Sequence, residues 1–448
     1  MDPVLLSRIQ FAVTIGFHYI FPPISIGLGL IIVIMEGIFI KTKNPLYYKM
    51  TRFWVKIFAL VFAIGVATGI VMEFQFGTNW ATYSRYVGDV FGSPLAAEGI
   101  FAFFLESGFL AILVFGWNRV SARTHFISAM MVCLGAHFSA VWIVVANSWM
   151  QTPAGYHMVG EGVAARAEIT DFWAMVLNPS TVERLTHTVI GAWQAGAFFV
   201  LSVSAYYILR KKHIDFAKAS LRIALFVALF ASVMQLVTGH DSAMGIARHQ
   251  PAKLAAFEGH YENEPGKLWL FGWVNEKDEK VRFGIGIPGM LSYMVYGDTE
   301  TPMTGLSSFA PEDRPPVNVV FQSYHLMVAI GMGLIALSVI GVFLLWRKKL
   351  FDQRWLMGIF VLSVLGPQMA NQLGWISAEV GRQPWIVYGL LRTENAVSKV
   401  VTANQVLGSL LMFTVIYIFL FTLFIYLLDH KIKKGPGEKD EPPAHHLA

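Results

Sequence analysis

Long apolar segments divide this chain into a series of stretches that can each cross a lipid bilayer. A membrane-spanning helix needs about 20 predominantly apolar residues. Nine segments reach or approach that length, and they lie near residues 12–40, 53–75, 95–117, 126–149, 186–209, 220–240, 319–345, 355–378 and 403–429. The last is the clearest, because no charged residue occurs between Val406 and Leu428. The pattern predicts an all-α integral membrane protein with about nine transmembrane helices.

The composition agrees with a membrane protein. Of the 448 residues, 55% are hydrophobic and 14% are charged, whereas about 25% of the residues in a soluble domain are charged. Residues 1–8 lack a basic segment and a small-residue cleavage site, so we expect them to lead into a retained helix. The single cysteine, Cys133, excludes an intrachain disulfide and a cysteine-based metal centre.

Basic residues gather in every second connection between the apolar segments. They are Lys41, Lys43, Lys49, Arg52 and Lys56 after the first segment, Arg119 and Arg123 after the third, Arg210, Lys211, Lys212, Lys218 and Arg222 after the fifth, Arg347, Lys348, Lys349 and Arg354 after the seventh, and Lys431, Lys433 and Lys434 after the ninth. Cytoplasmic loops of membrane proteins collect Lys and Arg. We therefore predict that the N-terminus lies outside and the C-terminus lies in the cytoplasm.

This pattern divides the chain into four parts. Residues 1–240 hold the first six predicted helices, residues 319–430 hold the last three, and residues 431–448 are expected to form a disordered cytoplasmic tail. Residues 241–318 form the longest connection, which has an acidic bias and apolar runs such as 268–271. Loops longer than about 15 residues are usually functional or disordered. The apolar runs favour a partly folded, functional loop on the outer side.

Side chains that ionise or bind metals interrupt the apolar segments. A charged group at bilayer depth is costly, which indicates a function or a neutralising partner. Haem iron is one such partner, since it accepts imidazole, thioether or carboxylate ligands. With a helical rise of about 1.5 Å per residue, several of these side chains fall in one layer near the outer surface. This layer contains His18, Glu98, His187, His325, Met327, Trp375 and Glu379, while Glu106 lies deeper.

Each of these residues also has an ordinary structural interpretation. A histidine near a helix end is usually a hydrogen-bonded interfacial group, and methionine commonly fills gaps in packing. His137, close to Ser139, fits a proton relay or a hydrogen bond between helices. The shared depth favours a functional cluster, but depth does not identify a cofactor.

Several longer motifs resemble subunit I of the cytochrome bd quinol oxidases, in the same order across nearly the whole chain. They are LSRIQFA at 6–12, GVATGIVMEFQFGTNW at 65–80, EGIFAFFLES at 98–107, ANSWMQ at 146–151, AKLAAFE at 252–258 and GWISAEVGRQPW at 374–385. The loop between the sixth and seventh helices is short, which is similar to the short-loop branch of that family.

The resemblance implies three haems: a low-spin b haem, a high-spin b haem, and haem d or a third b haem. His187 and Met327 resemble the axial pair of the low-spin haem, whose two ligands close both axial positions to oxygen. His18 and Glu379 resemble the protein ligands of the two high-spin haems, without an assignment of which binds which. Glu98 lies near that pair in the family pattern, as a second ligand or a proton donor.

The resemblance also implies roles for residues around the haems. Trp375 would lie between haems and assist electron transfer, and Arg382 would pair with haem propionates because guanidinium binds carboxylate bidentately. His325 stands where relatives can carry Arg beside the methionine ligand, so the charge near the low-spin haem would depend on pH.

The implied activity is that of a terminal respiratory oxidase in the bacterial cytoplasmic membrane. Lys253 and Glu258 match quinol-oxidising positions, where a carboxylate takes a proton beside a cation. Glu106 and Glu98 would be stations for protons entering from the cytoplasm. The enzyme would oxidise quinol at the outer face and reduce oxygen to water, generating a proton gradient without pumping.

The family also implies partners. A second membrane subunit and a small single-span subunit are expected in the same bilayer, and no nucleic-acid partner is expected. The sequence leaves the choice between ubiquinol and menaquinol open. Two alternatives are a membrane b-type cytochrome that passes electrons on without reducing oxygen, and a transporter. A transporter of this size is expected to show broken helices and an inverted repeat, and the sequence indicates neither.

Overall fold

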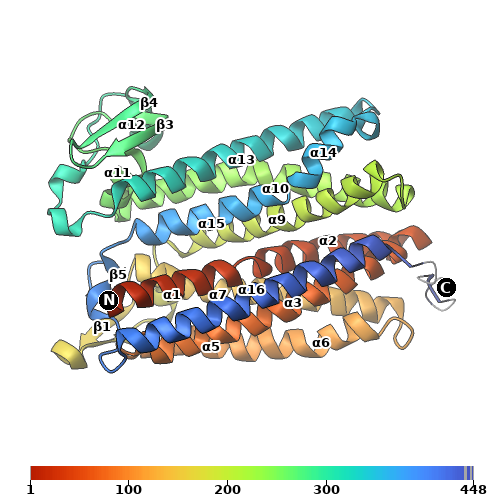
Figure 1. The fold of residues 1–448 in the computed structure, drawn as a ribbon, viewed down its shortest axis with the longest axis horizontal. Helices are drawn as coiled ribbons and strands as arrows, with labels where there is room; N and C mark the ends of the chain where they lie inside the picture. The colour runs from red at the N-terminus through yellow and green to blue at the C-terminus, as the bar shows by residue number, and fades with distance from the viewer. Residues whose placement is uncertain (1, 438–440, 444–445, 447–448) are drawn as a thin grey trace.

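The structure is a computed structural model that describes residues 2–437, 441–443 and 446. It is a bundle of long helices whose axes are roughly aligned, with three short β-hairpins gathered at one end (Figure 1). The N-terminus lies at the end with the hairpins and the C-terminus at the opposite end. The other residues of the predicted tail, 438–440, 444–445 and 447–448, lie outside the described residues.

Within the described part of the chain, eight helical segments are long and apolar enough to cross a membrane. They are Pro3–Thr42, Pro45–Thr78, Ala122–Gln151, Thr181–Leu209, Ile214–His249, Pro311–Trp346, Arg354–Val380 and Ala403–Lys434. The remaining predicted segment, 95–117, is built from three shorter helices: α5 (Gly88–Ala97), the π-helix η1 (Glu98–Phe103) and α6 (Phe104–Phe115). The all-α membrane fold predicted from the apolar pattern is confirmed.

Two of the eight segments are broken within the bundle, so the expectation from the sequence that no helix is broken is wrong. The first consists of α1 (Pro3–His18) and α2 (Phe21–Thr42), and Pro22 and Pro23 open α2. Proline is tolerated in the first turn of a helix but breaks a helix interior, so the chain interrupts its helix directly after His18. The segment Arg354–Val380 likewise divides into α14 (Arg354–Leu362) and α15 (Leu365–Val380).

The other spanning segments are single helices. They are α3 (Pro45–Thr78), α7 (Ala122–Gln151), α9 (Thr181–Leu209), α10 (Ile214–His249), α13 (Val317–Trp346) and α16 (Ala403–Lys434). Helix α10 extends beyond its predicted end at residue 240, and α16 extends beyond its predicted end at residue 430. Both helix ends contain charged residues, and a segment recognised by its apolar residues ends before them.

The connection between α10 and α13 is folded. It contains α11 (Pro251–Glu258), the antiparallel hairpin of β3 (Leu268–Asn275) and β4 (Lys280–Ile287), and α12 (Met290–Tyr296). Two further antiparallel hairpins pair β1 (Tyr156–Val159) with β2 (Arg166–Ile169), and β5 (Trp385–Val387) with β6 (Leu391–Arg392). The short helices are α4 (Ala81–Tyr86), α8 (Phe172–Val176), η2 (Gly162–Ala164), η3 (Leu306–Ser308), η4 (Pro311–Asp313), η5 (Leu350–Asp352) and η6 (Thr393–Asn395).

Helices α2 and α9 approach each other through facing glycines. A Cβ atom added at Gly196 would lie 2.6 Å from the Cα of Gly27, and one added at Gly27 would lie 2.9 Å from the Cα of Gly196. Small residues allow such close backbone packing between membrane helices. This contact holds α9 and α2 in the register that positions the side chains described below.

We predict that Gly196→Ala lowers the thermal unfolding midpoint of the purified complex. The added methyl group must push the two helices apart, and overpacking of this kind costs about 1–3 kcal/mol. The matched control is Gly408→Ala on α16, where an added Cβ meets nothing within 4 Å. Equal midpoints for the two variants would contradict the close packing of α2 and α9.

Candidate functional site

His18 lies at the last residue of α1 and rests against α3. Its Nδ1 atom is hydrogen-bonded to the Thr68 hydroxyl at 2.9 Å. Gly69, the next residue of α3, leaves room for the ring, because a Cβ there would lie 3.2 Å from the Cε1 atom of His18. Among the described residues, no hydrogen bond is recorded for Nε2 of His18.

His187, in the second turn of α9, has a closely similar setting on α10. Its Nδ1 atom is hydrogen-bonded to the Thr238 hydroxyl at 3.0 Å. A Cβ at Gly239 would lie 3.4 Å from Cε1 of His187. Here too, the described part of the structure records no hydrogen bond to Nε2.

His125 and His137 differ from these two histidines, because both of their ring nitrogens are occupied. His125 contacts Glu36 Oε1 through Nδ1 at 2.6 Å and the Leu113 carbonyl through Nε2 at 3.1 Å. In His137, Nδ1 contacts its own helix at the Cys133 carbonyl, and Nε2 accepts a hydrogen bond from Trp193 Nε1 at 2.8 Å. His137 therefore joins α7 to α9 and is not free to bind a metal.

His325 also uses both nitrogens. Nδ1 faces the Phe321 carbonyl and Nε2 faces the Trp269 carbonyl, each at 2.9 Å. A neutral imidazole can donate to only one of these two acceptors, whereas an imidazolium can donate to both. The ring ties α13 to strand β3 at the base of the hairpin.

Helix α15 packs against both Met327 of α13 and the part of α9 that follows His187. A Cβ at Gly374 of α15 would lie 2.9 Å from the Met327 sulfur, so this glycine leaves space for the thioether. One turn earlier on α15, Asn371 faces Gly191 of α9, where a Cβ would lie 2.9 Å from Asn371 Oδ1. Gly191 follows His187 by one helical turn. The two predicted axial ligands therefore flank the same stretch of α15.

Trp375 lies between α1 and α9. Its ring meets that of Tyr19, the neighbour of His18, edge to face at a centroid distance of 5.4 Å. The Arg184 guanidinium lies 5.8 Å from the Trp375 ring centroid, and Arg184 precedes His187 by one turn of α9. The indole of Trp375 thus contacts both the neighbour of His18 and a residue one turn from His187.

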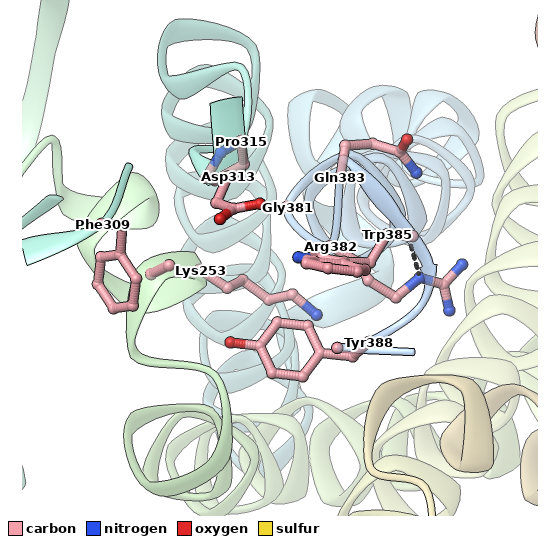
Figure 2. A pocket seen from close by; sticks show the side chains of 11 residues that line it. Lys253, Phe309, Asp313, Pro315, Gly381, Arg382, Gln383, Trp385 and Tyr388 are labelled. Atoms are coloured by element: carbon pink, nitrogen blue, oxygen red, sulfur yellow. Dashed lines mark hydrogen bonds between the residues drawn. The ribbon is translucent and has the colours of Figure 1, made fainter. Parts of the chain in front are cut away.

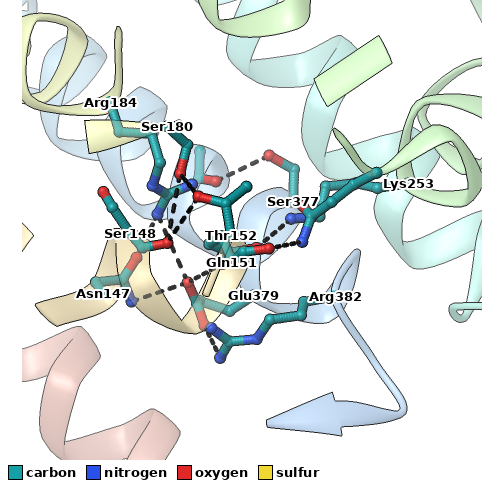
Figure 3. A network of polar contacts seen from close by, with 12 residues as sticks. Asn147, Ser148, Gln151, Thr152, Ser180, Arg184, Lys253, Ser377, Glu379 and Arg382 are labelled. Atoms are coloured by element: carbon teal, nitrogen blue, oxygen red, sulfur yellow. Dashed lines mark hydrogen bonds and ion pairs between the residues drawn. The ribbon is translucent and has the colours of Figure 1, made fainter. Parts of the chain in front are cut away.

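Glu379, at the end of α15, is the centre of a polar cluster (Figure 3). Its Oε1 accepts hydrogen bonds from Asn147 Nδ2 at 3.1 Å and from Gln151 Nε2 at 3.0 Å. Its Oε2 pairs with the Arg382 guanidinium, and Arg184 lies 3.9 Å from Oε1. We call these residues, together with Lys253, the Glu379 cluster.

Lys253 joins the cluster from α11. Its Nζ donates to Gln151 Oε1 at 2.5 Å, and Gln151 in turn donates to Glu379. Lys253 is buried, and burial together with the positive charge of Arg184 lowers the pKa of its ammonium group well below the usual value. Cations outnumber carboxylates in this cluster, which is an unfavourable arrangement for the protein alone.

The donor set of the cluster fits an additional anionic group. Arg184 Nε and Arg382 Nη1 are buried and lack a hydrogen-bond partner among the described residues. The same is true of Gln235 Oε1 and Asn371 Nδ2, which lie nearby between α9, α10 and α15. Buried polar atoms are normally hydrogen-bonded. Two guanidinium groups with unused donors suit the carboxylates of a haem propionate, since this pairing is bidentate and strong. The residues present therefore fit a haem at this end of the bundle.

The structure gives Glu379 several protein partners, which bears on its predicted role as an iron ligand. Both carboxylate oxygens are engaged, by Asn147, Gln151 and Arg382. A carboxylate has about four lone-pair sites, so these three hydrogen bonds leave one site, on Oε2, for an iron bond.

Lys253 and Glu258 share α11 but face different neighbours. Glu258 is buried against the hairpin, where Oε2 accepts from the Trp269 amide at 3.2 Å and lies 3.9 Å from His325 Nε2. Burial raises the pKa of the Glu258 carboxyl to about 8, an effect that the Trp269 hydrogen bond partly offsets. Its Oε1 has no hydrogen-bond partner among the residues that the structure describes. The cation-forming group beside Glu258 is thus His325 rather than Lys253.

A cavity of about 210 Å³ opens next to Lys253 (Figure 2). It lies between α11, the segment around Phe309 and Asp313, and the turn that carries Trp385 and Tyr388. Pockets that enclose drug-sized ligands measure about 300–1,000 Å³, so this one suits a single ring. Its wall combines aromatic rings with charged groups, including Asp313, whose Oδ1 pairs with Arg392 at 2.5 Å.

Glu98 and Glu106 face the same side of α7. The Ser139 hydroxyl donates to Glu98 Oε1 at 2.5 Å. Glu106 is buried against Gly135, where a Cβ would lie 3.0 Å from Glu106 Cγ, and its Oε1 has no hydrogen-bond partner. Gly135 and Ser139 are one helical turn apart, so the two carboxyl groups follow one another along α7.

Sequence reasoning missed several residues of this site. Thr68 and Thr238 carry no charge, and only the packing of helices shows that they meet the two histidines. Arg184 was detectable as a cation just before the predicted apolar segment 186–209, and Asn147 and Gln151 lie within the ANSWMQ motif.

Comparison with known proteins identifies close relatives. A family model for cytochrome bd terminal oxidase subunit I matches residues 6–436. The chain is 40% identical over 446 residues to cytochrome bd ubiquinol oxidase subunit 1 of Bacillus subtilis (strain 168), covering 97% of this chain and 94% of that protein. It is 34% identical over 503 residues to cytochrome bd-II ubiquinol oxidase subunit 1 of Escherichia coli (strain K12), covering 97% of each.

A solved structure also matches this fold. The structure of bd oxidase from Geobacillus thermodenitrificans aligns with a TM-score of 0.91 and 29% sequence identity. The alignment covers 97% of this chain and 99% of the other. The similarity therefore extends over the whole bundle and its hairpins.

Proposed function

The chain belongs to the cytochrome bd terminal oxidase subunit I family, and from that premise we propose how its residues serve quinol oxidation and oxygen reduction. It is a haem-containing, multi-pass membrane subunit of a quinol:O2 oxidoreductase that works with a second subunit. This membership favours the oxidase over both the electron-carrier and the transporter alternatives.

The observation that carries the proposal is the free Nε2 atom of His18 and His187. Unlike His125, His137 and His325, these two rings keep one nitrogen available for iron. We assign His187 and Met327 to the low-spin b haem, and His18 and Glu379 to the two high-spin haems, a b haem and either haem d or a third b haem. Bound haem would supply one-electron redox chemistry and, where an axial position stays open, the place where oxygen is reduced.

The protein holds and orients these groups with the Glu379 cluster. Arg382 and Arg184 are placed to bind propionates through their unused nitrogens. Trp375 fills the space between the surroundings of His18 and His187 with a polarisable ring. The indole thereby excludes water from the space between the two histidines.

Proton uptake from quinol is assigned to Glu258. Quinol oxidation releases protons, and a buried carboxylate with a pKa near 8 is suited to accept one at neutral to alkaline pH. His325, 3.9 Å away, is next to the carbonyls of Phe321 and Trp269, which would stabilise a proton passed to its ring.

Protons for water formation are assigned to Glu106, Glu98 and the Ser139 hydroxyl. These groups line one side of α7, and the unpartnered oxygen of buried Glu106 is available to a proton donor. His137 is an unsuitable relay because Trp193 and Cys133 occupy both of its nitrogens.

The proposed orientation follows from the basic connections and the opposite placement of the two termini. The end with the three hairpins would face outward, and the end with Lys212, Lys348 and Lys433 would face the bacterial cytoplasm. Quinol protons would then leave outside while protons for water enter from inside, which separates charge without a pump. The second membrane subunit and a small single-span subunit complete the proposed complex.

We predict that Lys277→Cys reacts with a membrane-impermeant maleimide in intact cells, whereas Lys212→Cys reacts only after lysis. Both lysines are exposed, at the β3–β4 turn and between α9 and α10. A Cys133→Ala background removes the native thiol. The reverse labelling pattern would refute the orientation.

We predict that His187→Ala removes the low-spin haem spectrum and leaves the high-spin signals largely present. The alanine lacks a ligand nitrogen, while the His18 site is on other helices. The reduced-minus-oxidised spectrum of the purified complex measures this. His137→Ala is the control and should keep all haem signals. A retained low-spin spectrum in His187→Ala would overturn the ligand assignment.

We predict that Glu258→Gln slows quinol-driven turnover on the order of 100-fold, as expected for loss of a general base. In the unaltered protein, turnover should rise as pH increases through about 8, because the carboxyl group must lose its proton before it can accept one. Tyr324 and His325 are the titratable groups of α13 that face it. The amide should abolish this rise.

The control for Glu258 is Glu262→Gln, which changes an exposed acid of the same loop. Oxygen reduction driven by an artificial electron donor should be nearly unaffected in both variants. Equal slowing of quinol-driven and artificially driven turnover in Glu258→Gln would count against a role at the quinol site.

A further inference from the structure

The same two-residue feature occurs beside both candidate ligand histidines, His18 and His187. Thr68-Gly69 of α3 faces His18, and Thr238-Gly239 of α10 faces His187. The two pairs are 170 residues apart (238 − 68) on different helices. Among the described histidines with recorded ring hydrogen bonds, only these two contact a threonine hydroxyl.

The hydroxyl hydrogen of each threonine is already committed. Thr68 Oγ1 donates to the Ile64 carbonyl at 2.9 Å, with the Gly65 carbonyl at 3.0 Å, and Thr238 Oγ1 donates to the Met234 carbonyl at 3.0 Å. A hydroxyl has one hydrogen and two lone pairs. Toward the histidine it can therefore only accept, so Nδ1 must carry the proton and Nε2 must carry the lone pair.

The glycine that follows each threonine leaves room for the imidazole ring of the histidine. A Cβ would lie 3.2 Å from the ring at Gly69 and 3.4 Å from it at Gly239. The imidazole can thus lie flat against the helix while its Nδ1 reaches the hydroxyl. Rotation of the ring would break the hydrogen bond and bring the other nitrogen to the helix surface.

We propose that Thr68 and Thr238 are positioning residues that set the tautomer of His18 and His187, so that Nε2 is the ligand nitrogen for haem iron. This inference rests on the proposed ligand roles of the two histidines. A hydrogen bond from the far nitrogen of a metal-bound imidazole orients the ring and raises its basicity. A more basic ligand favours ferric iron, so each hydroxyl lowers the reduction potential of its haem.

The test for Thr238 is the midpoint potential of the low-spin haem in the purified complex, with haem content determined by pigment extraction. Thr238→Val keeps the shape but removes the acceptor, so we expect an upward shift of the potential, a changed low-spin ferric electron paramagnetic resonance signal, or loss of that haem. Thr238→Ser keeps the hydroxyl and should restore the native values.

The control is Thr186→Val on α9, adjacent in sequence to His187. Thr186 is exposed and its hydroxyl donates to its own helix at the Val182 carbonyl, so this variant should leave the potential unchanged. If the valine and serine variants of Thr238 behave alike, or if Thr238→Val matches the unaltered protein in potential and spectrum, the inference is wrong.

The parallel test for Thr68 compares Thr68→Val and Thr68→Ser with Thr78→Val, an exposed threonine of the same helix. The valine variant should alter a high-spin haem signal and leave the low-spin potential unchanged, and the serine variant should be native. An unchanged low-spin spectrum in His187→Ala would instead refute the ligand assignment itself, which separates failure of the proposed function from failure of this inference.

Discussion

Every polar group inside a membrane bundle needs a partner in the protein or in something bound to it, because lipid offers none. This constraint explains the distribution of hydrogen bonds along the helices. His125, His137 and His325 have partners on both nitrogens and connect neighbouring helices. Within the described part of the chain, His18 and His187 have a recorded hydrogen-bond partner on one ring nitrogen only. The Nε2 atoms of these two rings therefore indicate where a bound group would find its ligands.

The same reasoning applies to charge. In the Glu379 cluster, Arg184, Lys253 and Arg382 surround one carboxylate, and two guanidinium nitrogens are buried without a partner. An isolated protein gains little from such an arrangement, since breaking or overloading a buried pair is costly. A cofactor with carboxylates and a metal satisfies both the cations and the open imidazoles. Breaks and close contacts in the fold, at Pro22 and at Gly27 with Gly196, set the helices in the positions this requires.

The sequence predicted the fold through long apolar runs, because a membrane helix must be apolar over its whole length. It also placed the candidate ligands, His187 and Met327 among them, through motifs and depth. The threonine partners were not predictable, because an apolar pattern does not show which helices are neighbours. For the same reason, the sequence did not show that Lys253 and Glu258 contact different parts of the protein. Only the structure shows that Lys253 contacts Gln151 whereas Glu258 contacts the hairpin. The hairpin strands were not predicted as strands, because a short apolar run such as 268–271 does not distinguish a strand from a helix.

The most direct measurement is an experimental density map of the purified complex that resolves the iron positions and the imidazole rings. The account predicts iron bonded to Nε2 of both His18 and His187, with each Nδ1 still directed at its threonine hydroxyl, and propionates near Arg184 and Arg382. Iron bonded through Nδ1, or haems held by other side chains while these two Nε2 atoms contact protein, would contradict it.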